Sequence, residues 1–576
     1  MDGSVGDTRP ALTLSGGASD MTPVTFDGLL GWLHMPRGRN NGVGVVLVSA
    51  LGRDGRCAYA PMRMFADQLA AAGFPTIRYD HLGSGDSLDL PDDEADALPD
   101  WITGMGQAAE ALRTRAGASQ VVMCGARIGA ALAMINPAPV DGLVLLAPVL
   151  AGRSWLRRLR FSASVTKKPE AGGSDEQPLD TEGLWLSSAT VGSLSRLDLA
   201  KLPPPKVPLF IASQNKPVSD YAAALAEAGA AIHTTDFPGF GDLYLETTVN
   251  EPPLHVFERA LAWLQQTFEP VAAPNAAAPA LQPDAPIQRP PGAVERVVRF
   301  GENLRGVLCE PEGPASRLPA VLFCNTGGDP RAGAGGFAAG AARRLAVRGV
   351  ASLRFDFAGI GDSPMRAGEP RPHVFETPRE ADADAAVDFL AEGRSDGVVV
   401  VGICSGAYHA LRTGWRNPKV TGVFAVSPIK LLWRPGDDVS FARDEYLYAF
   451  KDYAKAVFRP EAWKLLLQIG PFGLLRALGN RLIGKVQGWL SRSGGDSPFA
   501  KTKRFAQRGG RALFYMGVND TAVEEVATYF GARGAKFERL PGLAVDIVPE
   551  LDHGLVRRAS RQMAVDRLTT WLSAAK

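Results

Sequence analysis

Hydrophobic and polar positions follow the same order of patterns twice along the chain. Each series begins with two alternating apolar stretches joined by a turn, which predicts a β-hairpin. A continuous apolar run that ends in small residues follows, as in a buried parallel strand, and then come an amphipathic helix, a strand and a Gly-rich turn. The matching segments are 24–36 with 298–311, 43–52 with 319–328, and 63–87 with 342–363. The pattern predicts one fold written twice.

The two series also keep a constant separation. Asp356 lies 276 residues after Asp80, and the same separation relates four further pairs of residues. These pairs are Ser49 with Asn325, Gly83 with Gly359, Gly85 with Gly361, and Ser87 with Ser363. So much shared register indicates a duplication.

A change of composition divides the chain into domains. Residues 269–292 are crowded with Pro and Ala and predict an extended linker. The domains on either side are expected at 21–268 and 293–576, with 1–20 as a flexible extension and an insertion at about 429–510. Each domain alternates strands with helices, which is typical of the α/β class with a mostly parallel sheet covered on both faces.

The Gly-rich turn gives the chain a family resemblance. D-x-x-G-x-G-D-S occurs at 80–87 and at 356–363, followed in each copy by a strand and the pattern G-x-x-x-G. This arrangement resembles the α/β-hydrolase superfamily, nearest to its serine aminopeptidase and dienelactone-hydrolase-like branches. The resemblance covers almost the whole chain and implies two tandem α/β-hydrolase domains. It implies no substrate, because this fold hosts esterases, thioesterases, peptidases, acyltransferases and proteins without activity.

The C-terminal domain has a complete set of catalytic parts. The stretch VGICSGAY at 401–408 has the outline of a nucleophile elbow, with Cys404 at its apex. The superfamily places the acid and the histidine later in the chain, after two further strands, and Asp520 and His553 stand at those positions. The resemblance therefore implies a Cys-Asp-His triad. A small core residue is the alternative role for this cysteine.

The expected oxyanion hole surrounds the elbow. One donor would be the backbone N–H of Ser405, directly after the nucleophile, and the other the N–H of Thr326 or Gly327. The Ser405 side chain is expected to point away from the site, which makes Ser405 the weaker candidate nucleophile. Asn325 stands where relatives often carry His, so the second donor is open between the two residues named.

The N-terminal domain has other residues at these positions. Its elbow, GARIG, has Arg127 at the apex, and an arginine cannot serve as nucleophile. Lys216 aligns with the acid, and no histidine aligns with His553. This copy is therefore predicted to be catalytically dead. Either it is a packing partner, or Arg127 and Lys216 form an anion site, unless an acid such as Asp220 or Asp242 neutralises them.

The insertion in the C-terminal domain predicts a cover over the site. Residues 461–490 are rich in Leu, Trp and basic side chains, with apolar positions at helical spacing. Packing as a lid is the simplest interpretation. Lining of an acyl pocket, contact with a carrier protein and peripheral contact with a membrane surface stay open.

Composition excludes several other functions. The chain has 576 residues, 46% of them hydrophobic, and a net charge of +1, which gives no electrostatic reason for binding nucleic acid. Its five cysteines lack CxxC spacing, so we expect no disulfide framework, metal or cofactor. Without a signal-peptide pattern or a long apolar run, a cytoplasmic protein with no membrane span is expected.

These observations predict a hydrolase of an ester or thioester that acts through a thioester on Cys404. Its substrate would be a small molecule or a carrier-bound acyl group. An acyltransferase would use the same triad, because a thioester reacts readily with amines and alcohols. A binding or scaffold protein without activity is the alternative from another class. The sequence does not predict the oligomeric state.

Overall fold

The protein is described here by a computed structural model. The described residues are 20–166, 177–271, 288–369, 374–375, 379–433 and 496–574. The helical stretch 461–490 that the sequence predicts as a lid lies outside them, as do residues 1–19.

The N-terminal domain is built on one eight-stranded sheet in the order β1-β2-β4-β3-β5-β6-β9-β10. The first three strands in this order pair antiparallel, and the remaining pairs are parallel. The strands are β1 (Asp20–Phe26), β2 (Leu29–Met35), β3 (Val43–Val48), β4 (Thr76–Tyr79), β5 (Gln120–Ala126), β6 (Gly142–Leu146), β9 (Leu209–Ala212) and β10 (Ile232–Thr235). A separate two-stranded hairpin consists of β7 (Leu179–Thr181) and β8 (Leu184–Leu186).

The C-terminal domain repeats this sheet strand for strand, in the order β11-β12-β14-β13-β15-β16-β17-β18. Its strands are β11 (Ala293–Phe300), β12 (Leu304–Pro311), β13 (Ala320–Phe323), β14 (Ser352–Asp356), β15 (Val398–Ile403), β16 (Val420–Val426), β17 (Arg511–Gly517) and β18 (Leu543–Val548). Central strands such as β3 and β13 are buried along their whole length, as expected of parallel strands covered on both faces. The predicted tandem α/β fold is confirmed.

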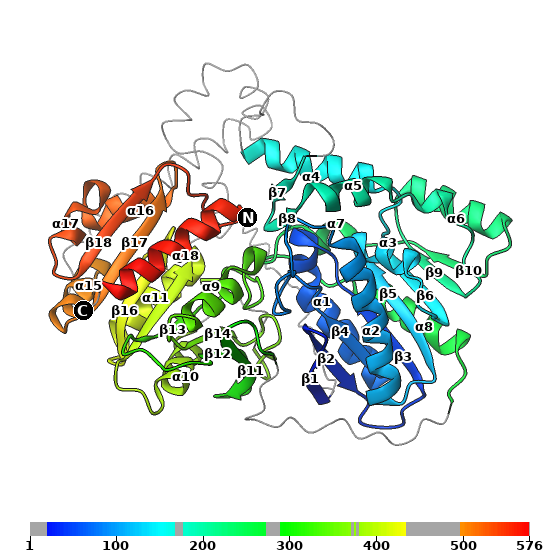
Figure 1. The fold of residues 1–576 in the computed structure, drawn as a ribbon, viewed down its shortest axis with the longest axis horizontal. Helices are drawn as coiled ribbons and strands as arrows, with labels where there is room; N and C mark the ends of the chain where they lie inside the picture. The colour runs from blue at the N-terminus through cyan, green and yellow to red at the C-terminus, as the bar shows by residue number, and fades with distance from the viewer. Residues whose placement is uncertain are drawn as a thin grey trace, which may run out of the picture.

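Helices cover both faces of each sheet (Figure 1). Helices α1 and α8 pack on one face of the N-terminal sheet and α2 and α3 on the other, while α9 and α18 face α10 and α11 across the second sheet. The N-terminal helices are α1 (Gly52–Ala71), α2 (Leu98–Ala116), α3 (Ile128–Ile135), α4 (Gly152–Thr166), α5 (Ser188–Arg196), α6 (Lys216–Glu227), α7 (Phe240–Leu243) and α8 (Leu254–Thr267). The C-terminal helices are α9 (Phe337–Ala346), α10 (Glu380–Ala391), α11 (Ser405–Arg416), α15 (Pro498–Gln507), α16 (Ala522–Phe530), α17 (Ala535–Glu538) and α18 (Arg558–Ser573).

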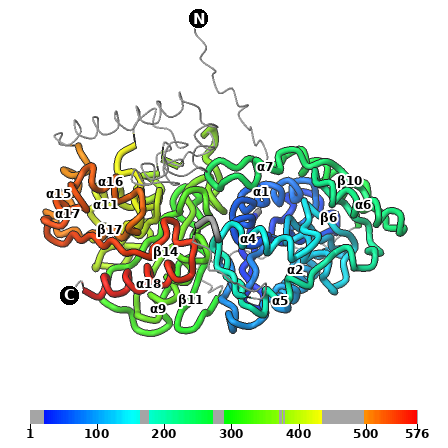
Figure 2. The backbone as a smooth tube through the Cα atoms, turned by 90° about the horizontal axis from the view of Figure 1, so that it is seen from above, coloured from blue at the N-terminus to red at the C-terminus, as the bar shows by residue number. Residues whose placement is uncertain are grey.

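The two domains lie side by side (Figures 1 and 2) and meet through equivalent residues. Arg78 at the end of β4 forms an ion pair with Asp362 of the C-terminal domain. Arg354, 276 residues after Arg78, pairs at 2.7 Å with Asp86, which lies 276 residues before Asp362. Because each partner contacts the counterpart of the other, the interface has the reciprocal form of a two-fold dimer.

Apolar and charged groups both contribute to this interface. Leu30 and Trp32 on β2 pack with Val297 and Val307 on β11 and β12. Beside them Arg331, with a side chain only 1% exposed, binds Asp86 of the N-terminal domain and Asp356 and Asp362 of its own domain at 2.6–2.7 Å. The domains are therefore joined by a buried cluster of ions next to a small apolar contact.

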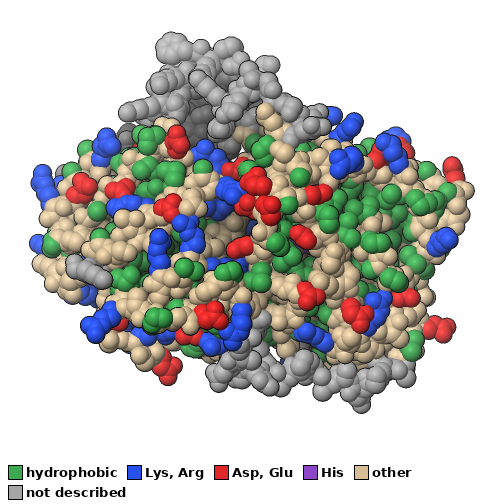
Figure 3. All heavy atoms as spheres, viewed as in Figure 1, with side chains coloured by type: hydrophobic (Ala, Val, Ile, Leu, Met, Phe, Trp, Pro, Cys, Tyr) green, Lys and Arg blue, Asp and Glu red, His purple; other side chains and the backbone are tan. Residues whose placement is uncertain are grey.

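The surface agrees with the small net charge of +1. On the face drawn in Figure 3, acidic and basic side chains are interspersed. In the part of the chain that the structure describes, no helix is long and apolar enough to cross a membrane.

Candidate active site

The elbow of the C-terminal domain places Cys404 on a sharp turn between β15 and α11. Its φ of 55° and ψ of −114° are rare for a residue with a side chain, and its N–H donates to the carbonyl of Val426 at 2.9 Å. The flanking glycines are required for this turn. A Cβ on Gly402 would lie 2.1 Å from the backbone of Gly406, and one on Gly406 would lie 2.6 Å from the Asn325 carbonyl oxygen.

A methyl group at Gly406 should therefore disturb the elbow. We expect Gly406→Ala to slow alkylation of Cys404 and to lower the melting temperature, since the contact is with backbone that has little room to move. The measurement is the alkylation rate beside the thermal unfolding curve. Gly340→Ala in α9 is the matched control, because a Cβ there meets no atom within 4 Å.

Asp520 and His553 come together at the carboxyl ends of β17 and β18. His553 Nδ1 lies 3.0 Å and 3.1 Å from the two carboxylate oxygens of Asp520. The Asp520 side chain is 2% exposed and the His553 side chain 26% exposed, so the acid is buried behind an accessible ring. Although burial opposes the charged form, the contact with His553 holds the pKa of Asp520 below its ordinary value.

The same contacts act on the histidine. Burial by itself lowers the pKa of His553, but the charge and hydrogen bond of Asp520, together with a hydrogen bond to Cys404, raise this pKa to about 10. With Nδ1 bound to Asp520, Nε2 is the ring nitrogen left to serve the thiol. The three residues that the sequence predicts as a triad are thus brought together, with the ring poised to carry a proton at neutral pH.

The oxyanion loop is bound by the residue that follows the elbow apex. Ser405 Oγ accepts a hydrogen bond from the Gly327 N–H at 2.8 Å. That N–H is therefore already used, which favours Thr326 over Gly327 as the second predicted donor. The N–H groups of Ser405 and Thr326 stay the predicted pair.

Asn325, which follows β13, has a structural role. Its amide donates at 2.9 Å to the Asp329 carbonyl and to the Asp356 carboxylate, and its oxygen accepts from the Phe357 N–H. The Gly-rich turn also closes on Asp356, which accepts from the N–H of Asp362 at 3.0 Å. The motif that marks the fold in the sequence is thus a carboxylate-centred turn, and its second acid, Asp362, binds Arg78 of the other domain.

The N-terminal elbow has the same backbone conformation, with an arginine in place of the cysteine. Arg127 has a φ of 54°, nearly that of Cys404, and its side chain pairs with Asp54 at 3.4 Å and lies over the ring of Phe240. Lys216 is exposed and pairs with Asp220 at 2.9 Å. The structure thus pairs both cations with carboxylates, and the anion site of Arg127 and Lys216 stays a prediction without added support.

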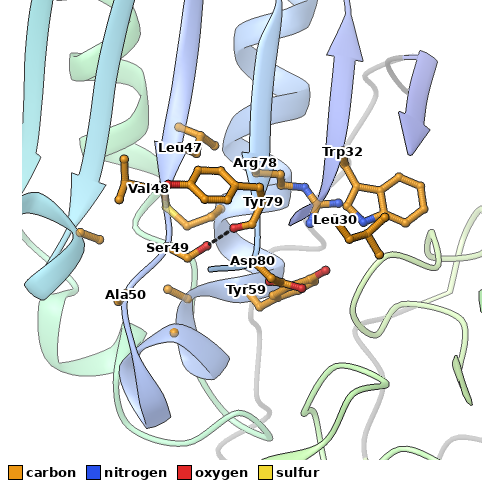
Figure 4. A pocket seen from close by; sticks show the side chains of 14 residues that line it. Leu30, Trp32, Leu47, Val48, Ser49, Ala50, Tyr59, Arg78, Tyr79 and Asp80 are labelled. Carbon is orange, nitrogen blue, oxygen red and sulfur yellow. Dashed lines mark hydrogen bonds between the residues drawn. The ribbon is translucent and has the colours of Figure 1, made fainter. Parts of the chain in front are cut away.

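A cavity lies beside this elbow, between β3, β4 and α1 (Figure 4). It measures about 30 Å³, and Ser49 and Asp80 are among the residues that line it. Burial and the neighbouring Asp86 raise the pKa of Asp80 to about 7. In the C-terminal domain the equivalent carboxylate, Asp356, binds Arg331 and Asn325. The N-terminal domain has smaller side chains in their place, such as Ser49 for Asn325, and the cavity is therefore left unfilled.

Burial changes the acidity of the four other cysteines. Burial raises the pKa of Cys57, Cys309 and Cys324 to about 12, and raises that of Cys124 as well. Thiols of this kind stay protonated at neutral pH. Among the described residues no group of His, Cys, Asp and Glu side chains is arranged to hold a metal ion.

Both sheets have the same strand order, and in each domain an elbow follows the fifth strand along the chain. These features define a tandem protein of the α/β-hydrolase fold. No family model and no curated protein matches the sequence. Among solved structures, the chain is similar to Est1E of Butyrivibrio proteoclasticus with ferulic acid bound (16% identity, TM-score 0.34, covering 43% of this chain and 98% of that one).

Two further structures are similar over one domain's length. An esterase of Pyrococcus furiosus has 16% identity and a TM-score of 0.32, covering 49% of this chain and 90% of its own. A proline iminopeptidase-related protein of Thermus thermophilus has 21% identity and a TM-score of 0.31, covering 44% of this chain and 100% of its own. At these values the similarities carry no statement about the reaction.

Proposed function

We propose that the C-terminal domain is an esterase or thioesterase that transfers the acyl group of its substrate to Cys404 and then to water. The observation that supports this most directly is the contact of His553 with Asp520 on one side and with Cys404 on the other, with Cys404 on a strained elbow. The substrate would be a small molecule or a carrier-bound acyl group, and the N-terminal domain would take no part in the chemistry.

The reaction would proceed in two balanced steps. Cys404 gives its proton to His553 and its sulfur attacks the substrate carbonyl, and the oxyanion that forms accepts hydrogen bonds from the N–H groups of Ser405 and Thr326. As the carbonyl re-forms, the bond to the leaving group breaks and His553 gives that group its proton. In the second step His553 takes a proton from water, and the hydroxide attacks the thioester carbonyl. The bond to the Cys404 sulfur then breaks, and the free acid is released as product.

The thiol of Cys404 should react faster than the other four thiols of the chain. Brief treatment with limiting iodoacetamide between pH 5 and pH 9, followed by intact-protein mass spectrometry, should modify a single fast cysteine below neutral pH. The other four thiols should stay unmodified there, because burial raises the pKa of each of them. Cys404→Ala should remove the fast reaction, and His553→Ala should slow it.

Two controls make this result specific. Cys324→Ala removes a partly buried thiol from the adjacent strand end and should leave the fast phase intact. Wild type and Cys404→Ala are then compared on p-nitrophenyl esters and acyl thioesters, with the products separated. Release of free acid supports hydrolysis, whereas acyl transfer to an added amine or alcohol in preference to water supports the transferase. A Cys404 that reacts like an ordinary thiol would leave the binding-protein alternative in place.

A further inference from the structure

The N-terminal domain contacts the loop that carries His553. The contact is made by the β7–β8 hairpin, whose turn consists of Glu182 at φ 51° and Gly183 at φ 76°. At its tip the Gly183 N–H donates to the Val556 carbonyl at 3.1 Å. A Cβ on Gly183 would lie 2.8 Å from the Gly335 nitrogen, so the tip is packed closely between two segments of the C-terminal domain.

Asp180 of the same hairpin caps helix α18. Both of its carboxylate oxygens accept from the Arg558 N–H, at 3.0 Å and 2.8 Å. Arg558 is the first residue of α18, so this N–H has no acceptor within its own helix. A carboxylate at this end also faces the positive end of the helix dipole, which strengthens the contact.

The Arg558 side chain fixes the hairpin from the other direction. Its guanidinium lies 4.5 Å from the centre of the Trp185 ring and pairs with Asp93 at 2.6 Å and Glu94 at 3.2 Å. All three partners belong to the N-terminal domain. The first turn of α18 is therefore held by that domain through both its backbone and its side chain.

Only a short loop separates this anchor from His553. Within it, Leu555 is fully buried with a φ of 52°, a conformation that persists only where its surroundings impose it. The Val556 carbonyl accepts from Gly183 and also from Arg561 Nη1 at 2.7 Å. Movement of the hairpin would release this loop and with it the ring that must reach Cys404.

A second contact ties the hairpin to the oxyanion loop. Arg56 of α1 donates to the Glu182 carbonyl at 2.7 Å and pairs with Asp329 at 3.1 Å. Thr247 packs against the same loop, since a Cβ on Gly328 would lie 2.1 Å from its carbonyl oxygen. The N-terminal domain therefore contacts both backbone segments that border Cys404.

We propose that Asp180 is a positioning residue for His553, and that the degenerate N-terminal domain completes the catalytic centre of its neighbour through the β7–β8 hairpin. The inference rests on the proposed function of Cys404. It assigns the N-terminal domain a role in the reaction without chemistry of its own.

The test compares Asp180→Ala with a matched carboxylate in the same segment of the N-terminal domain, between β6 and β9. Asp198 likewise caps a backbone N–H, that of Ala200 at 3.2 Å, and its described contacts stay within the N-terminal domain. We expect Asp180→Ala to lower kcat on a p-nitrophenyl ester by about tenfold to a hundredfold with little change in KM, because a small displacement of a catalytic group has that effect. Asp180→Asn keeps one acceptor oxygen and should recover part of the loss.

A readout that needs no substrate accompanies the kinetics. NMR of ¹³C-labelled histidine, assigned with His553→Gln, should find the His553 pKa near 10 in the wild type and lower in Asp180→Ala, because the released ring loses Asp520. If Asp180→Ala and Asp198→Ala behave alike in both measurements, the positioning role is overturned. If the wild type neither turns over esters nor alkylates rapidly, the proposed function fails, while the His553 titration still decides the role of Asp180.

Discussion

Asp520→Asn should lower acyl transfer by about a thousandfold and move the titration of His553 to lower pH. Asp520 supplies the charge and the hydrogen bond that raise the pKa of His553 to about 10 against a burial effect that lowers it. An asparagine amide has no charge and can present its NH₂ group to the ring, so it can favour the wrong tautomer. Burial would then dominate, and the imidazolium would be lost at neutral pH.

The sign of the pH effect follows from the direction of the shift. In the wild type, His553 binds its proton more tightly in the folded protein than in the unfolded chain. Its contribution to stability is therefore complete below the unfolded pKa of about 6.5 and is lost as the pH rises through the folded pKa of about 10. In Asp520→Asn this alkaline loss of stability should shift to lower pH or disappear.

The measurements are ester turnover, the ¹³C-histidine titration and unfolding as a function of pH. Asp566→Asn is the matched control, because its carboxylate is 55% exposed and pairs with Arg344 away from the site. If Asp520→Asn turns over the ester at the wild-type rate, or if the His553 pKa is unchanged, Asp520 does not control the protonation of the His553 ring.

The repeat, the elbow and the order of the three site residues could be predicted from the sequence, because each depends on a local pattern. Alternating apolar runs indicate half-buried strands, and continuous apolar runs indicate buried ones. The pattern G-x-x-x-G marks the two elbows, where Cys404 and Arg127 have a positive φ. The hydrogen bond from the Gly327 N–H to the Ser405 hydroxyl could not be predicted in this way. It depends on how two loops from different strands approach each other.

The contacts between the domains were beyond sequence reasoning for a similar reason. Leu179 and Asp180 end a polar, Gly-rich run, yet both residues lie in β7, where Leu179 is buried in the core of its own domain and Asp180 binds the other domain. A three-residue strand gives almost no periodic signal. One clue was present: R-x-D ends the same strand in both copies, as Arg78 with Asp80 and Arg354 with Asp356, and arginine inside a buried strand requires a partner.

Arg354→Met should lower the free energy of unfolding by about 3–5 kcal/mol, the usual effect of removing one partner from a buried ion pair. Its side chain is fully buried and binds Asp86 at 2.7 Å and Glu295 at 2.9 Å, so both carboxylates would lose a partner in a medium of low dielectric. Arg289→Met is the control, since that side chain is 60% exposed and should change the free energy by less than about 1 kcal/mol.

The interface contains a second ion pair equivalent to that of Arg354. Arg78 pairs with Asp362 as Arg354 pairs with Asp86, so Arg78→Met should also lower the free energy of unfolding. Adding Asp86→Leu to Arg354→Met should restore part of the stability, because it removes the excess negative charge that the loss of Arg354 leaves in the buried cluster. Urea unfolding with one probe in each domain measures both effects. Single variants no less stable than Arg289→Met would show that the ion cluster does not stabilise the contact between the domains.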